Sequence, residues 1–313
     1  MGLLDDLLDK IRARFRGVLA EPGCPIGWQP NALAPVFYGF RDYDVQFPLV
    51  ATARLAPGAV GADPGLPVHR ARVFFPSLDG SPQNAAILSG CGRFPVIVFA
   101  HGECQQDVDH YKQWFEIPAL LARAGFIVVV PELSQSLPVG SNDHAIVGGM
   151  FGWIRSDWEF RATALPSPAN GVVGHSFGGG VAAEFVKLNP GGVAAFASLS
   201  GQTGEGLAPV ANAQIPKLFT FGSDALMDAI LLDLNPLPTG PAWPGLLPPK
   251  HVAILKDIGH FDYLRAGRVP CEGLRGTCTH TPALAAELLV MFFGRYLRPE
   301  GVPDLRPRIP ASL

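Results

Sequence analysis

The sequence predicts an α/β fold in which helices cover both faces of a mostly parallel central sheet. From about residue 70 onward, short runs rich in β-branched residues alternate with longer stretches of helical periodicity, which is the pattern of repeated βαβ units. Polar, glycine-bearing segments follow several of the runs directly, as expected where loops leave the carboxyl ends of parallel strands. A chain of 313 residues with 48% hydrophobic content is long enough for one such domain with a large core.

Seven apolar runs are predicted to be strands. They cover residues 72–75, 95–100, 126–130, 171–174, 194–199, 217–221 and 251–256. Four stretches with apolar residues at helical spacing are predicted to be helices, at residues 111–124, 145–155, 178–188 and 283–296. The connections are long enough to return over the sheet in the right-handed sense that parallel strands require.

The first 68 residues are predicted to be a lead-in packed on the main domain, which covers residues 69–313. Residues 20–68 are rich in Pro, Gly and Ala, and one alternating patch at residues 43–49 predicts an edge strand. Near the start, Leu3, Leu7 and Ile11 have helical spacing, which favours a helix docked on the domain. An interfacial membrane helix is the alternative for this segment.

Charge and hydropathy exclude several classes of partner. The charged fraction is 16% and the formal net charge is -3, so no basic stripe is present that would bind nucleic acid. No run reaches the ~18 apolar residues that a membrane span needs, and aspartates interrupt the apolar residues where a secretory signal would lie. We therefore expect an unexported, cytoplasmic protein with no transmembrane segment. The sequence leaves the oligomeric state open.

The cysteine content leaves the redox compartment open. Five cysteines are an odd number, so at least one is unpaired within the chain. Cys271 and Cys278 lie close together in a glycine-bearing loop and would be able to form a disulfide in an oxidising compartment.

The segment around Ser176 predicts a nucleophile on a sharp turn. Gly174-His175-Ser176-Phe177-Gly178 lies between the predicted strand at residues 171–174 and the predicted helix at residues 178–188. A serine on such a turn has strained backbone angles, and glycines two residues to either side leave room for the neighbouring strand and helix. The start of the helix also directs N–H groups toward the serine, where they favour an oxyanion.

A base and an acid are predicted to follow Ser176 in the chain. His260 follows the last predicted strand and is the candidate base, with His280 in reserve. Asp224 directly follows the strand at residues 217–221 and is the preferred acid, because the carboxylate must lie at the sheet edge to meet an imidazole. Asp228 lies one helical turn further on and remains the alternative.

The oxyanion hole is predicted from two backbone N–H groups. One belongs to Phe177, and the other belongs to Glu103, in the loop after the strand at residues 95–100. The Glu103 carboxylate would oppose a developing oxyanion, so its side chain is expected to turn outward or to find a cationic partner. His101, Cys104, Asp109 and their neighbours have the residue types of metal ligands, but their spacing matches no zinc pattern. No metal and no cofactor are therefore predicted.

In this order the motifs resemble those of the α/β-hydrolase superfamily. The similar branch holds cutinase-like polyester hydrolases, platelet-activating-factor acetylhydrolases, chlorophyllases and dienelactone-hydrolase-like proteins. The resemblance spans about residues 70–297, with anchors at residues 94–102, 121–131, 174–179 and 259–263. It implies the α/β-hydrolase fold and a cofactor-free serine esterase that acts through an acyl-enzyme on a small-molecule or lipid-like ester.

Two departures from the polyester-degrading relatives bear on the substrate. In those relatives an aromatic residue usually stands at the position of Glu103, and a tryptophan follows the strand that here ends at Leu199. Both aromatic residues are missing, so hydrolysis of plastics or cutin is not carried over to this chain. The same centre also suits a thioesterase, an amidase or an acyltransferase, because triad chemistry does not determine the leaving group. A catalytically silent binding protein is the alternative from another class, and it would be marked by a lost triad residue.

Overall fold

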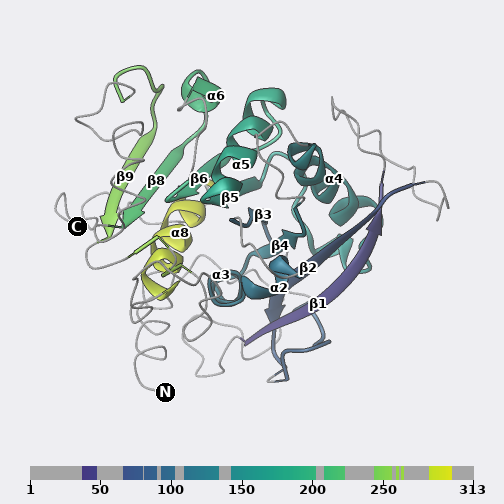
Figure 1. Ribbon diagram of the computed structural model, residues 1–313. Coiled ribbons are helices and arrows are strands. Elements are labelled where there is room, and N and C mark those ends of the chain that lie inside the picture. Colours follow the sequence, from purple (N-terminus) through teal and green to yellow (C-terminus); the bar gives the residue numbers. More distant parts are fainter. Residues whose placement is uncertain are drawn as a thin grey trace.

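A computed structural model of the chain describes residues 37–47, 66–79, 81–89, 93–102, 109–133, 142–201, 208–222, 243–255, 259–260, 262–263 and 282–297. These residues contain one eight-stranded sheet with the strand order β1-β2-β4-β3-β5-β6-β8-β9 (Figure 1). The strands are β1 (Phe37–Gln46), β2 (Val68–Ser77), β3 (Val96–Ala100), β4 (Ile127–Pro131), β5 (Asn170–His175), β6 (Ala195–Leu199), β8 (Lys217–Gly222) and β9 (Lys250–Leu255). The helices are α2 (His110–Gln113), α3 (Glu116–Arg123), α4 (Asp143–Ser156), α5 (Phe177–Leu188), α6 (Ala208–Ala211) and α8 (Pro282–Leu297), with a 3-10 turn at Arg161–Thr163.

The sheet is parallel from β4 to β9. β3 pairs in parallel with both β4 and β5, and the parallel pairing continues through β6 and β8 to β9. The antiparallel part is confined to one side, where β1 pairs with β2 and β2 pairs with β4. The predicted α/β fold with a mostly parallel sheet is confirmed, and β3 and β5 lie side by side near its centre.

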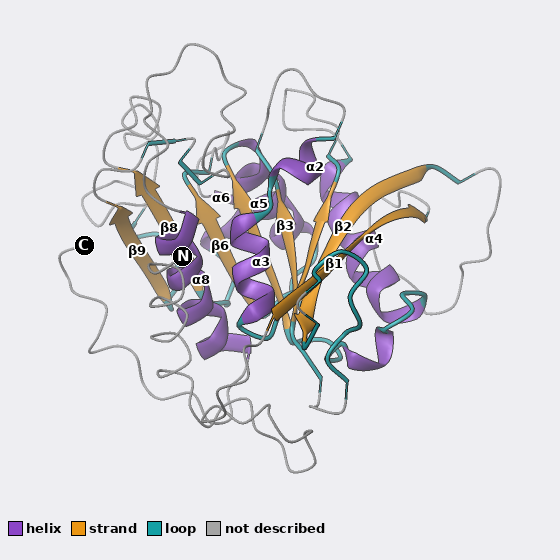
Figure 2. Ribbon diagram, turned by 90° about the horizontal axis from the view of Figure 1, so that it is seen from below, coloured by secondary structure: helices purple, strands orange, loops and turns teal. Residues whose placement is uncertain are grey.

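Helices cover both faces of the sheet, and each face has its own hydrophobic core. α4 and α5 contribute to the core on one face, and α2, α3 and α8 contribute to the core on the other. Figure 2 shows α3 and α8 lying across the same face of the sheet. Along β3, Val96 and Val98 face the first core, whereas Ile97 and Phe99 face the second. This alternation explains why the central strands are continuous apolar runs, since both of their faces are buried.

The prediction of one helix over residues 111–124 is wrong, because the structure has two. α2 ends at Gln113 and α3 begins at Glu116, and Trp114 between them has an extended ψ of 94°. Pro118 explains the break, since a proline inside one continuous helix would remove the hydrogen bond to residue 114. In the observed structure Pro118 lies in the first turn of α3, where backbone N–H groups have no partner within the helix.

The edge strand forms earlier in the chain than predicted. The alternating patch at residues 43–49 predicted it, but β1 runs from Phe37 to Gln46 and pairs with β2 along its whole length. This strand therefore joins part of the lead-in to the same sheet as the main domain. The predicted N-terminal helix and all five cysteines lie outside the described residues. No described helix combines the length and the apolar character needed to cross a bilayer.

Candidate active site

Ser176 is the single residue between β5 and α5, where the chain turns from a strand directly into a helix. Its backbone has φ 50° and ψ −124°, and a positive φ is uncommon for a residue other than glycine. Strain of this kind persists only where the surroundings enforce it, and it is concentrated at functional sites. The turn thus presents Ser176 at the carboxyl edge of the sheet.

Two glycines make this turn possible. A Cβ on Gly174 would overlap the backbone carbonyl of Gly178, and a Cβ on Gly178 would overlap the carbonyl oxygens of Ala100 and His101. Backbone atoms cannot move aside as the end of a flexible side chain can. The turn therefore packs directly onto the end of β3, the neighbour of β5 in the sheet.

His260 contacts Ser176 directly. Its Nε2 lies 2.9 Å from Ser176 Oγ, a separation at which a general base can accept a hydroxyl proton. Both side chains are nearly buried, since Ser176 is 7% exposed and His260 is 4% exposed. The structure thus brings together a predicted nucleophile and a predicted base that are 84 residues apart in the chain.

A short turn after β9 carries His260. Asp262 N–H donates to the Gly259 carbonyl over 3.1 Å, and Gly259 N–H donates to Asp262 Oδ2 over 2.7 Å, so the turn is closed by two hydrogen bonds. Tyr263 anchors the turn to the sheet, because its hydroxyl accepts from Ser200 Oγ over 3.1 Å and lies 3.3 Å from Thr220 Oγ1. The turn that carries His260 is therefore held by contacts to Ser200, directly after β6, and to Thr220 in β8.

His175 supports the turn from the other side. Its Nε2 lies 2.8 Å from the backbone carbonyl of His260, and its ring packs 4.7 Å from that of Trp114 and 5.3 Å from that of Tyr263. A carbonyl only accepts hydrogen bonds, so Nε2 must carry the proton. Burial, together with the neighbouring charge of His260, holds the pKa of His175 well below its ordinary value. His175 is therefore neutral, with a bare Nδ1 that has no hydrogen-bond partner among the described residues.

His101 has the opposite tautomer and holds the end of β3. Its Nε2 accepts from Leu133 N–H over 3.0 Å, so its Nδ1 carries the proton and donates to the Gly102 carbonyl over 2.9 Å. The side chain is fully buried, and this burial lowers the pKa of His101. Gly102 lies against the turn at Ser176, since a Cβ on it would stand 3.1 Å from Ser176 Cβ. His101 thus fixes the backbone next to Ser176.

Of the remaining predicted site residues, only Phe177 lies among the residues that the structure describes. The N–H of Phe177 lies in the first turn of α5, where such groups are not bonded within the helix. Glu103, Asp224, Asp228 and His280 lie outside the described residues, so the second oxyanion donor and the acid stay predictions.

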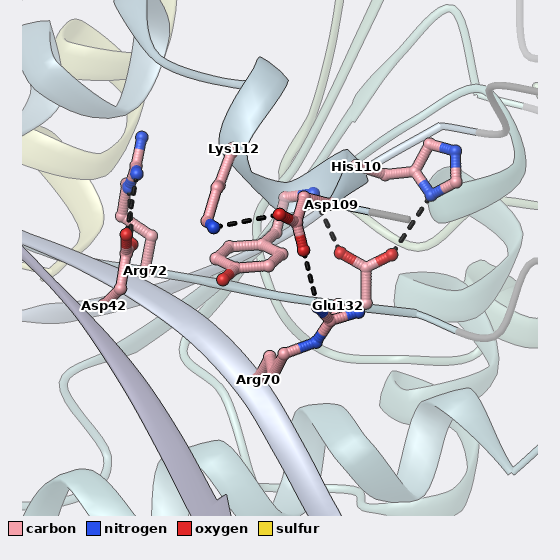
Figure 3. Close-up of polar contacts among 8 residues, drawn as sticks. Asp42, Arg70, Arg72, Asp109, His110, Lys112 and Glu132 are labelled. Atoms are coloured by element: carbon pink, nitrogen blue, oxygen red, sulfur yellow. Dashed lines mark hydrogen bonds and ion pairs between the residues drawn. The ribbon is translucent and has the colours of Figure 1, made fainter. Parts of the chain in front are cut away.

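Charged residues of β2 and α2, together with those just before α2 and just after β4, form paired contacts (Figure 3). Asp109 lies between Arg70 and Lys112, at 2.5 Å and 2.9 Å from their nitrogens. His110 Nδ1 lies 3.1 Å from Glu132 Oε1, and Glu132 Oε2 accepts from the backbone N–H at the start of α2. Asp109 and His110, which belong to the segment with metal-ligand residue types, therefore have other partners here. The described residues contain no group of histidine, cysteine and carboxylate side chains suited to a metal ion.

Four residues that hold Ser176 and His260 in place were not predicted to do so. His101 and His175 stand beside glycines in the predicted motifs, and Asp262 and Tyr263 follow His260, so all four lay within segments already singled out. Their residue types were visible in the sequence. Their partners were not, because Leu133, Ser200, Thr220 and the carbonyl of His260 come from distant parts of the chain.

One comparison with known protein families agrees with this architecture. A family model described as an alpha/beta hydrolase fold matches residues 95–241. A search of the curated proteins gives no match. Among solved structures, the chain is similar to the dienelactone hydrolase from Anabaena variabilis ATCC 29413, with 16% sequence identity and a TM-score of 0.48. That match covers 83% of this chain and 99% of the other.

The strand order, the strained serine between β5 and α5, and the matched segment define a protein with the α/β-hydrolase fold. This fold agrees with the one that the predicted resemblance implies, and the family match covers residues 95–241.

Proposed function

We propose that the protein is a serine carboxylic ester hydrolase that acts through an acyl-enzyme intermediate. The observation that carries the proposal is the 2.9 Å contact between Ser176 Oγ and His260 Nε2 at a turn with positive φ. A nucleophile and a base within hydrogen-bond reach, with the base held by further groups, are the signature of covalent catalysis by serine. The buried surroundings of both side chains strengthen electrostatic interactions at the site.

Acylation begins when Ser176 Oγ attacks the ester carbonyl carbon and its proton passes to His260 Nε2. The carbonyl oxygen becomes an oxyanion, and we assign its binding to the N–H groups of Phe177 and Glu103. Asp224 orients the imidazole and stabilises the imidazolium in this scheme. The intermediate then expels the alcohol, which takes the proton from His260, and the acyl group remains on Ser176.

Deacylation repeats these steps with water in place of the serine. His260 Nε2 accepts a proton as the water oxygen attacks the acyl carbon, and a second oxyanion forms in the same place. Its collapse breaks the bond to Ser176 Oγ, which recovers the proton from His260. One carboxylic acid and one alcohol leave for each ester and water consumed, so no cofactor is needed.

A fluorophosphonate probe and a series of p-nitrophenyl esters test the proposal. Wild-type protein should be labelled and should hydrolyse at least one ester, whereas Ser176→Ala should lose labelling and about 10⁶-fold in kcat. An unlabelled wild-type protein that hydrolyses none of the esters would overturn the proposal. Turnover that survives Ser176→Ala would assign the chemistry to another group.

The acid is tested by two matched substitutions. Asp224→Asn should lower kcat by about 10⁴-fold, because the base loses the carboxylate that selects its tautomer, whereas Asp228→Asn should leave most of the activity. The reverse result would transfer the role to Asp228. Esters, thioesters and amides of the same acyl group, compared by kcat/KM, decide between an esterase, a thioesterase and an amidase.

A further inference from the structure

We infer that His175 is a positioning residue, which holds the catalytic base in register with the nucleophile; the inference rests on the function proposed above. Two consecutive residues of the turn after β5 contact the same residue, His260. Ser176 Oγ meets its ring at Nε2 over 2.9 Å, and His175 Nε2 donates to its backbone carbonyl over 2.8 Å. The ring and the backbone of His260 are thus both held by two adjacent residues, His175 and Ser176.

This arrangement removes a freedom that the base would otherwise have. His260 lies on a turn after β9, whereas Ser176 directly follows β5, and β6 and β8 lie between these two strands in the sheet. A small shift of the turn would therefore change the distance between the base and the nucleophile. His175 is the last residue of β5 and precedes Ser176 directly. Its hydrogen bond to the carbonyl of His260 therefore holds the base at a fixed distance from the nucleophile.

The surroundings of His175 keep it in the required state. The ring is buried against Trp114 and Tyr263, and the rings of His175 and His260 lie 4.9 Å apart. The donor must be Nε2–H, because its partner is a carbonyl. A proton on Nδ1 would add a buried charge with no acceptor among the described residues. His175 therefore acts as a permanent neutral donor and takes no part in proton transfer.

Two substitutions of similar shape isolate the donor. His175→Gln keeps an N–H group at about the same reach, and His175→Met removes it while preserving the length of the side chain. Since a displacement of about 1 Å can cost 10²-fold in rate, His175→Met should lower kcat for a p-nitrophenyl ester about 100-fold with KM nearly unchanged. His175→Gln should remain within about fivefold of the wild type, which corresponds to one weakened neutral hydrogen bond.

His251→Met is the control for the loss of a histidine elsewhere. His251 lies on β9 and contacts the hydroxyl of Tyr296 on α8, so its substitution should leave kcat unchanged. Thermal unfolding of all three variants separates activity from folding. Equal losses in the Gln and Met variants, or wild-type kcat in the Met variant, would overturn the inference.

A spectroscopic measurement tests the hydrogen bond without relying on turnover. In protein labelled with ¹⁵N-histidine, the signals that disappear in His175→Gln should be those of a neutral ring protonated at Nε2, with an N–H proton that exchanges slowly. An Nδ1–H tautomer, or rapid exchange, would overturn the inference even if the ester hydrolase proposal holds. Conversely, a wild-type protein that shows this signal but hydrolyses no ester would overturn the proposed function alone.

Discussion

At the scale of single residues, the turn at Ser176 depends on a glycine, which has no Cβ. Gly178 lies where any Cβ would overlap the backbone carbonyl oxygens of Ala100 and His101. The contact joins the first turn of α5 to the end of β3, so a side chain at this position would push apart the two elements that form the site. Gly191 differs, because it has φ +87° but open space around the position of a Cβ.

These two glycines give a matched prediction. Gly178→Ala should lower the free energy of unfolding by about 3 kcal/mol, through overpacking against rigid backbone, and should abolish ester turnover. Gly191→Ala should cost about 1 kcal/mol, from the left-handed backbone conformation alone, with turnover retained. Urea denaturation and p-nitrophenyl ester assays measure both quantities. A Gly178→Ala protein with wild-type activity would contradict the close packing of the turn onto β3.

The two residues to which we assign the chemistry were predictable because they stand at motif positions. Ser176 has glycines at fixed offsets, and His260 follows a strand, so local patterns mark both. The groups that hold them in place were not predictable in this way. The partner of His175 is a backbone carbonyl 85 residues away, and a carbonyl is present at every residue and leaves no trace in the sequence.

At the scale of elements, a buried lysine joins the segments that lead into the last two strands. Lys217 is the first residue of β8 and is fully buried. Its ammonium donates to the carbonyls of Ala213, Ile215 and Leu247, at 2.5 Å, 2.9 Å and 3.0 Å. The ammonium thus binds carbonyls in the segment before β8 and in the segment before β9, and it holds these two segments together.

Removal of this cation should weaken the β9 side of the sheet. Lys217→Met leaves three carbonyls without this donor, and we expect a loss of about 3 kcal/mol in the free energy of unfolding. Lys250→Met is the control, because Lys250 is less buried and its ammonium contacts the carbonyl and the ring of one residue, Trp243, so we expect a smaller loss of about 1 kcal/mol. Hydrogen exchange should show faster opening of β9 in the Lys217 variant alone. Equal effects of the two substitutions would contradict a structural role for Lys217.

The prediction of elements was most accurate where burial is two-sided. β3 and β4 differ from their predicted bounds by at most one residue at each end, because strands that are buried on both faces form continuous apolar runs. β1 was predicted several residues too late, since an edge strand has one exposed face and tolerates Arg41 and Asp42 within it. The break between α2 and α3 was missed because the helical spacing of apolar residues continues across it.

At the scale of the whole molecule, buried neutral histidines link folding to pH. Burial lowers the pKa of both His101 and His175, whereas the unfolded chain has the ordinary value near 6.5. Below that pH the unfolded state binds more protons than the folded state. The stability that depends on these groups is therefore fully present above about pH 6.5 and is lost progressively as the pH falls.

This linkage predicts the shape of the acid transition. Each of the two histidines should contribute a slope of up to about 1.4 kcal/mol per pH unit below about pH 6.5, before the carboxylates begin to titrate. The free energy of unfolding, measured by urea denaturation between about pH 5 and pH 7.5, should show this slope. His175→Gln should reduce it by the share of one proton. An unchanged slope in that variant would mean that His175 is protonated in the folded protein.

The contact between Ser176 and His260 also has a consequence during synthesis. A ribosome releases the chain from its N-terminus, so β1 to β6 and the serine turn emerge well before the segment that carries the base, 84 residues later. A nascent chain can thus assemble most of its sheet while the serine still lacks the histidine that would take its proton. Emergence of the segment that carries His260 is therefore the event that lets this contact form, and a chain that stops before it keeps the strained serine turn without its histidine.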